Sequence, residues 1–188
     1  MTLPKKFIVI LLAIAALPAL GMSPAFAQQA TWLTEENIMA FMHETETMYQ
    51  KPFDEYVTAL ERVTHDDSLF QAVTIIRTPD KASTEIPVNL DKKALISTAR
   101  DGYDSMQGAA LSQTIDEIAI NADKKSATVK STATITNQKL SPSNALNITL
   151  GDSVASCTDN LVYTPMVGVQ VIKSQCQLEI TVKQEQEL

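Results

Sequence analysis

The chain has 188 residues, with 22 acidic against 15 basic side chains and a formal net charge of −7. Affinity for nucleic acid comes chiefly from neutralised phosphates, and the basic residues here form only short pairs such as Lys92-Lys93. We therefore expect neither a nucleic acid nor an anionic membrane surface as a partner. The length fits one domain, large enough to fold without disulfides or metals.

The first 27 residues have the three parts of a secretory signal peptide. Two lysines precede an apolar run over residues 7–20, and Ala25 and Ala27 supply the small residues of a cleavage site. As a helix the run would span about 21 Å, short of the roughly 30 Å hydrocarbon core, which argues against a membrane anchor. We predict cleavage between Ala27 and Gln28, a single mature domain of residues 28–188 without a membrane span, and a periplasmic or secreted location.

The mature chain begins with a pattern typical of an amphipathic helix that bends. Thr34 suits an N-cap, and Glu35 and Glu36 fall in the first turn, where the helix dipole favours negative charge. Apolar residues then recur at steps of three and four, namely Ile38, Phe41, Met42, Met48, Tyr49, Phe53, Tyr56, Val57 and Leu60. Pro52 interrupts this pattern, so we expect a break there and a second helix from about Pro52 to Arg62.

The rest of the chain changes to a period of two, with one more helix. Residues 68–78 predict a strand, and a short strand follows whose Pro87 suits an edge. Asp91 is the predicted N-cap of a helix that ends near Gly102. From Leu111 onward two hairpins are expected, which turn at "NADKK" and near "PMVG". Helices followed by antiparallel strands indicate an α+β fold.

The only two cysteines, Cys157 and Cys176, both lie in the last predicted hairpin. If "PMVG" is a four-residue loop, Thr164 pairs with Val169 and the cysteines face each other, close enough for a bridge. A bulge at Gly168 would shift this register by one. We predict a structural disulfide, because exported compartments are oxidising. A redox-active pair is the alternative, but the spacing is unlike Cys-x-x-Cys and no flanking positive charge lowers a thiol pKa.

Two stretches, "LTEENIMAFMHETETMYQKPFDEYVTALERV" and "IDEIAINADKKSATVKS", resemble the nuclear transport factor 2-like superfamily, also described as SnoaL-like or cystatin-like. The resemblance covers about residues 33–183. It implies a cystatin-like α+β barrel, in which a curved antiparallel sheet packs on the kinked helix pair and a further helix around a conical pocket. The family includes isomerases, dehydratases, cyclases, binding modules and dimerisation domains, so it implies a homodimer through the sheet as one assembly and no single function.

Four side chains are candidates to line such a pocket. Catalytic relatives place Asp and Tyr there, and Tyr49, Phe53 and Tyr56 lie on the apolar stripe of the first helices. The alternative for each tyrosine is a core position whose hydroxyl finds a buried partner. His65 precedes two aspartates and suits a general base or metal ligand, or simply the end of a helix followed by a turn. No aspartate falls in a matching motif, so we assign no catalytic residue.

Other motifs that would identify an enzyme are absent from the sequence. It has no phosphate-binding glycine loop, no Gly-x-Ser-x-Gly and no convincing metal-ligand spacing, so we expect no metal and no cofactor. Met39, Met42 and Met48 are expected as core filler.

The sequence thus favours an exported module that binds a small apolar ligand or another protein. The alternative is a cofactor-free isomerase, lyase or cyclase that acts on a small apolar substrate through Tyr49 or Tyr56 and a nearby carboxylate. Whether the protein is an enzyme stays open at this point.

Overall fold

A computed structural model describes residues 32–79, 82–136 and 148–185. The predicted signal peptide and its cleavage site at Ala27 and Gln28 lie outside these residues. The elements in chain order are α2 (Glu35–Glu46), a 3-10 helix η1 (Met48–Gln50), α3 (Phe53–Val63), β1 (Thr64–Arg77), β2 (Thr84–Asp91), α4 (Lys92–Met106), β3 (Ala110–Ile120), β4 (Ser126–Thr136), β5 (Ile148–Thr164) and β6 (Gly168–Glu185).

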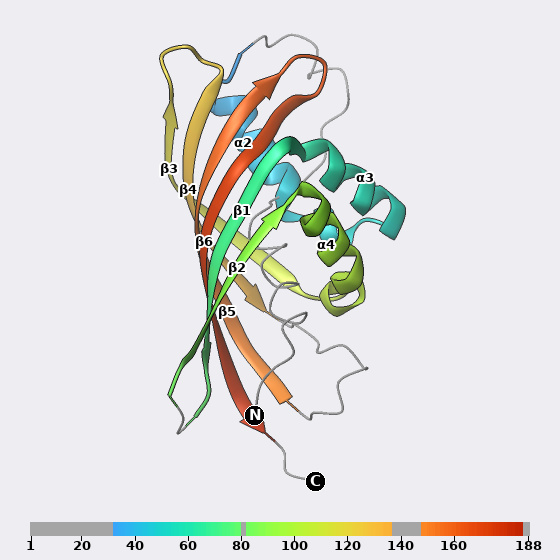
Figure 1. Ribbon diagram of the computed structural model, residues 1–188, viewed down its shortest axis with the longest axis vertical. Coiled ribbons are helices and arrows are strands. Elements are labelled where there is room, and N and C mark those ends of the chain that lie inside the picture. The colour runs from blue at the N-terminus through green and yellow to red at the C-terminus, as the bar shows by residue number, and fades with distance from the viewer. Residues whose placement is uncertain (1–31, 80–81, 137–147, 186–188) are drawn as a thin grey trace.

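The strands form one curved sheet in the order β2-β1-β6-β5-β4-β3, and the helices lie on its inner side (Figure 1). This confirms the predicted α+β fold, with a sheet packed on a bent helix pair and a further helix. The sheet is mixed rather than wholly antiparallel, because β1 pairs in parallel with β6. Hairpin partners can be predicted from neighbouring segments, but a parallel pair needs a long connection that no local pattern reveals.

The N-terminal helix begins where the sequence predicts. The Thr34 hydroxyl accepts a hydrogen bond from the backbone N–H of Asn37 at 3.1 Å, and the Asn37 side chain accepts the Thr34 N–H at 2.9 Å. This reciprocal pair satisfies two donors at the helix end. The break is wider than a kink at Pro52, because α2 already ends at Glu46 and η1 intervenes before α3.

The following helix also starts as predicted and runs further. Asp91 caps α4 by accepting the N–H of Ala94 at 2.7 Å. The helix continues through Gly102 to Met106, which is fully buried, because packing of its last turn outweighs the roughly 1 kcal/mol penalty of a helical glycine. Pro87 lies on β2, at the edge of the sheet, as expected.

Two irregularities in the last hairpin cancel each other. The loop is one residue shorter than predicted, since Thr164 pairs with Gly168, which has a left-handed φ of 98°. Ile172 is then an extra residue in β6, and this bulge shifts the register back by one. Cys157 therefore faces Cys176 as predicted, with a Cα–Cα distance of 4.2 Å and a disulfide S–S distance of 2.08 Å.

The core lies between the helices and the inner side of the sheet. Met42 and Met48 are buried in it as predicted, whereas Met39 is 44% exposed and does not fill the core. Position 39 follows the buried Ile38 by a single residue, which turns it away from the stripe. Within the described ranges, no helix has the length and apolarity that crossing a bilayer would need.

Candidate functional site

A carboxyl group lies buried on the inner side of the sheet. Asp159, on β5, is only 1% exposed and faces Ser174 on β6 and Val129 on β4. Ser174 donates a hydrogen bond to this carboxyl. Within the part of the chain that the structure describes, the Oδ1 atom of Asp159 has no hydrogen-bond partner. Buried aspartates are rare unless they are paired, so this half-satisfied carboxyl is the most unusual polar group of the core.

Burial changes the protonation of this group. It raises the pKa of Asp159 to about 7, while the hydrogen bond from Ser174 acts in the opposite direction. Desolvation disfavours the charged carboxylate, which explains the sign. Among the described residues no charged side chain adds to the shift. Asp159 therefore changes charge close to neutral pH, a property that clusters at functional sites.

The disulfide occupies the adjacent position on the same face. Cys157 lies two residues from Asp159 on β5, and Cys176 lies two residues from Ser174 on β6, so all four side chains point inward. Ser174 Oγ is 3.4 Å from Cys176 Sγ. Carboxyl, hydroxyl and disulfide thus lie next to one another on the inner face of β5 and β6.

A small cavity opens beside these groups. Its volume is about 10 Å³, room for about one water molecule, and it is lined by Phe70, Gln71, Ala72, Val88, Leu90, Leu95, Ser174 and Cys176. Leu95 belongs to α4 and the other lining residues come from β1, β2 and β6. In this structure the inner face is therefore closed by α4.

Strand β1 adds further unsatisfied polar atoms. The hydroxyls of Thr64, Ser68 and Thr74 are buried and have no hydrogen-bond partner among the residues that the structure describes. Thr74 pairs with Leu178 on β6, a residue with 0% exposure, so it faces the core. Native proteins pair nearly all buried polar atoms, and several unpaired ones in one sheet call for a physical explanation.

The two tyrosines predicted to line a pocket are buried, at 3% and 4% exposure, but neither lines this cavity. The hydroxyl of Tyr49 donates to the carbonyl of Ala109 at 3.1 Å and accepts a backbone N–H of β3 at 3.2 Å. Tyr49 thus fits the alternative of a core tyrosine with a buried partner. Burial, and then the neighbouring Tyr103, raise the pKa of Tyr56.

Phe53 and His65 also lie away from the cavity. Phe53 is 39% exposed and packs edge-on against Tyr103, with ring centroids 5.2 Å apart. His65 is half-buried at the start of β1, where its Nδ1 accepts the backbone N–H of Asp67 at 3.2 Å.

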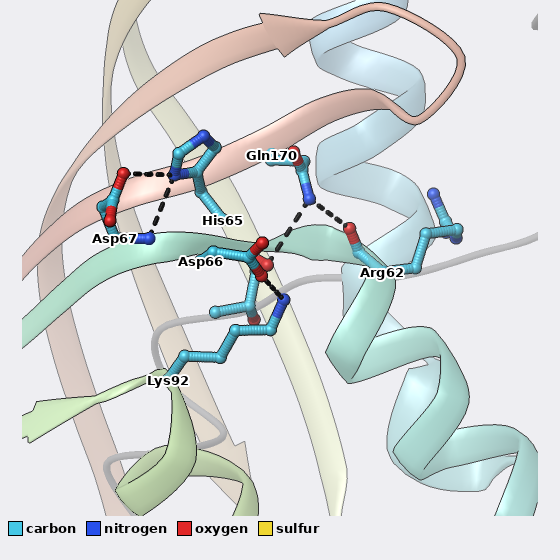
Figure 2. A network of polar contacts seen from close by, with 7 residues as sticks. Arg62, His65, Asp66, Asp67, Lys92 and Gln170 are labelled. Atoms are coloured by element: carbon cyan, nitrogen blue, oxygen red, sulfur yellow. Dashed lines mark hydrogen bonds and ion pairs between the residues drawn. The ribbon is translucent and has the colours of Figure 1, made fainter.

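The polar residues around His65 do not converge on one point. Figure 2 shows His65 turned toward Asp67, whereas Asp66 is turned toward Lys92, whose Nζ lies 2.8 Å from its carboxylate. The hydrogen bond and charge of Lys92 lower the pKa of Asp66. The described residues contain no cluster of three ligands that could hold a metal. His65 thus lies just after the end of a helix, as its alternative had it, but α3 leads directly into β1 and no turn follows.

Sequence reasoning missed Asp159 as a site residue, although a signal was present. Cys157, Asp159 and Leu161 alternate along β5, so a strand that points one cysteine inward also points the aspartate inward. Aspartates are mostly exposed in folded proteins, so the sequence analysis did not expect Asp159 to be buried.

Comparison with known proteins supplies similar folds only. A scan against protein-family models and a search of curated proteins gave no match. Among solved structures, a ketosteroid isomerase-like protein from Erwinia carotovora atroseptica is 11% identical, covers 77% of this chain and 92% of its own, and has a TM-score of 0.43. A nuclear transport factor 2-like protein from Cytophaga hutchinsonii is 17% identical, with 77% and 98% covered and a TM-score of 0.44.

A third similar structure, a nuclear transport factor 2-like protein with a cystatin-like fold from Novosphingobium aromaticivorans, is 13% identical, with 70% and 72% covered and a TM-score of 0.40. The names of these three structures are those of the superfamily that the sequence resembles. At such identities and TM-scores the likeness says nothing about activity. The function is therefore argued from the residues of this chain.

Proposed function

We propose that the protein is an exported binding module whose inner sheet face holds a small, largely apolar ligand through Asp159. The observation that carries this proposal is the buried carboxyl with an unpaired oxygen. Leaving a buried polar atom without a partner costs about 1–3 kcal/mol, which a ligand that offers a hydrogen-bond donor would recover. The apolar surroundings select a ligand that is mostly hydrocarbon.

Binding requires movement of α4. The cavity beside Ser174 has room for about one water molecule, so any larger ligand needs the wall formed by Leu95 to move away from β1 and β2. Such a ligand would then lie between α4 and the sheet, with Ser174 of the cavity lining at its polar end. Asp159, the cross-strand neighbour of Ser174, comes within reach as the space widens. The site is thus a closed form that a ligand opens.

Export is part of the proposal. The disulfide between Cys157 and Cys176 supports it, because such bridges persist in oxidising compartments. Cleavage between Ala27 and Gln28 and a periplasmic or secreted location follow from the predicted signal peptide.

Native mass spectrometry of protein expressed with its full N-terminus and exported tests the proposal. We expect an extra mass that stays bound in native spectra and departs on denaturation. Asp159→Asn should lose this mass, whereas Asp152→Asn, the same change at an exposed position of β5, should retain it. Wild-type protein that carries no extra mass and takes up none of a panel of small apolar alcohols would contradict the proposal. The native mass also shows whether the protein forms the homodimer implied by the family resemblance.

A second candidate is a cofactor-free isomerase, lyase or cyclase, favoured by the pKa of Asp159 near 7. A carboxyl that titrates there can both accept and donate a proton at neutral pH. Incubation with small cyclic ketones in D₂O, followed by proton NMR, separates the two candidates. Exchange of C–H next to the carbonyl that disappears in Asp159→Asn would favour the enzyme. Binding without exchange would favour the binding module.

A further inference from the structure

The Ser174 hydroxyl lies between the buried carboxyl and the disulfide. Asp159 and Ser174 form one cross-strand pair of β5 and β6, and Cys157 and Cys176 form a neighbouring pair on the same face. The Ser174 hydroxyl contacts both sides, since it donates to the Asp159 carboxyl and lies 3.4 Å from Cys176 Sγ. One hydroxyl therefore separates the carboxyl from a sulfur of the bridge.

The two cysteines of the bridge differ in their surroundings. Cys157 is 5% exposed, whereas Cys176 is half-buried and is one of the residues that line the small cavity. The cysteine whose sulfur Ser174 contacts is thus also the one that lines the cavity.

We propose that Cys157 and Cys176 form a reversible dithiol–disulfide couple, in which Asp159 exchanges a proton with Cys176 through Ser174. The reaction partners are small thiols and disulfides that reach Cys176 from the cavity side when α4 moves. This activity shares Asp159, Ser174 and the movement of α4 with the ligand site proposed above, but it does not require that a ligand binds there.

The chemistry balances with a dithiol as the reductant. One thiolate of the dithiol attacks Cys176 Sγ, the S–S bond breaks, and Cys157 leaves as a thiolate that takes up a proton from water. The second thiolate of the reagent then attacks its own sulfur in the mixed disulfide. Cys176 leaves as a thiolate and receives a proton from Ser174, which is reprotonated by Asp159. Two electrons pass to the protein, one proton enters from water, and the other moves within the protein from Asp159, which is left as a carboxylate. The reagent becomes a cyclic disulfide.

Oxidation runs the same steps in reverse. The carboxylate of Asp159 draws a proton from the Cys176 thiol through Ser174, and the resulting thiolate attacks an external disulfide. Thiolates are the reactive species in such exchange, so a base beside one cysteine sets the rate. With a pKa near 7, Asp159 can serve as that base at neutral pH.

Few other groups compete for this role. Val129 on β4 and Leu161 on β5 flank Asp159 on the inner face and are apolar. Tyr49 and Tyr56 are the buried tyrosines of the first helices, and neither contributes to the pKa of Asp159. The sequence shows no positive charge beside either cysteine, which spoke against a redox-active pair. In the structure the proton donor is Asp159, which belongs to the neighbouring cross-strand pair.

Reoxidation kinetics of the exported protein test the proposal. The protein is fully reduced with dithiothreitol, freed of reagent and reoxidised with glutathione disulfide between pH 5.5 and 9, and bridge formation is followed by thiol alkylation and intact mass. The wild-type rate should show a break near pH 7. Ser174→Ala and Asp159→Asn should slow reoxidation at pH 7 by about tenfold and abolish the break. Ser174→Thr keeps the hydroxyl and should stay within about twofold of the wild type.

Controls separate this role from structural support. Asp152→Asn should reoxidise like the wild type, and circular dichroism shows whether each reduced variant stays folded. If Asp159→Asn does not fold, the comparison of Ser174→Ala with Ser174→Thr decides alone. Equal rates and equal pH profiles in the wild type and Ser174→Ala would overturn the proposal, as would reduction of the wild-type bridge only at the rate of global unfolding.

Discussion

At the scale of single residues, Asp159 makes the stability of the fold depend on pH. Its pKa is about 7 in the fold and 3.8 for a free side chain, so the unfolded chain loses this proton first as pH rises. Its contribution to stability is therefore fully present below about pH 4 and is lost as pH rises toward 7. The difference of about three units corresponds to about 4 kcal/mol.

Asp159→Asn should remove this pH dependence. Between pH 4 and pH 8 the free energy of unfolding of the wild type should fall by up to about 4 kcal/mol more than that of the variant. Urea unfolding at pH 4, 6 and 8 measures the difference, with Asp152→Asn as the control that keeps the wild-type profile. Parallel profiles for wild type and Asp159→Asn would show that the carboxyl is not buried as the structure has it.

Tyr49 gives a second prediction at this scale. Tyr49→Phe removes the hydrogen bond to Ala109 and leaves a buried carbonyl without its donor, so it should destabilise the protein by about 1–3 kcal/mol. Urea unfolding measures this loss. The extra mass of a bound ligand should still be present in native spectra of this variant, because Tyr49 does not line the cavity. Lost binding at unchanged stability would instead place Tyr49 in the site.

At the scale of elements, the start of α2 depends on its capping box. Thr34→Ala removes the hydroxyl that accepts the N–H of Asn37 and should destabilise the fold by about 1 kcal/mol. Thr58→Ala, at an exposed position inside α3, is the matched control and should have little effect. Thermal unfolding of both variants checks this. Equal midpoints would mean that α2 contributes little to the cooperative unit.

The elements also show which features the sequence could predict. Caps at Thr34 and Asp91 are local, since each depends on residues a few positions apart. The edge position of Pro87 was predictable because proline has no N–H for a central strand. The parallel pairing of β1 with β6 and the bulge at Ile172 depend on segments far apart in the chain. Local patterns therefore predicted the helices and hairpins, while the mixed sheet needed the structure.

The candidate site also has some features that the sequence could predict and others that it could not. The cysteine pairing could be predicted from hairpin register, although the loop and the bulge that produce it were not. The pocket residues could not be predicted, because they depend on which helix covers which strand. Leu95 of α4, rather than the tyrosines of the first helices, closes the cavity beside Ser174.

At the scale of the whole molecule, the disulfide joins the two longest strands at the centre of the sheet. Replacing Cys157 and Cys176 together by Ala should lower the free energy of unfolding by up to about 3 kcal/mol, from the loop-entropy estimate for a separation of 19 residues. Urea unfolding of the variant and the oxidised wild type measures this. A variant as stable as the wild type would mean that the bridge does not stabilise the fold.

The central claim is that the inner face holds a buried carboxyl whose pKa lies near 7 and which has an oxygen to offer a partner. Carbon-13 NMR of the Asp159 carboxyl, assigned by comparison with Asp159→Asn, measures its titration directly. We predict a midpoint near pH 7. A midpoint near 4, the ordinary value for an aspartate, would show that water or a positive charge reaches Asp159. In that case both proposals for this face would fail.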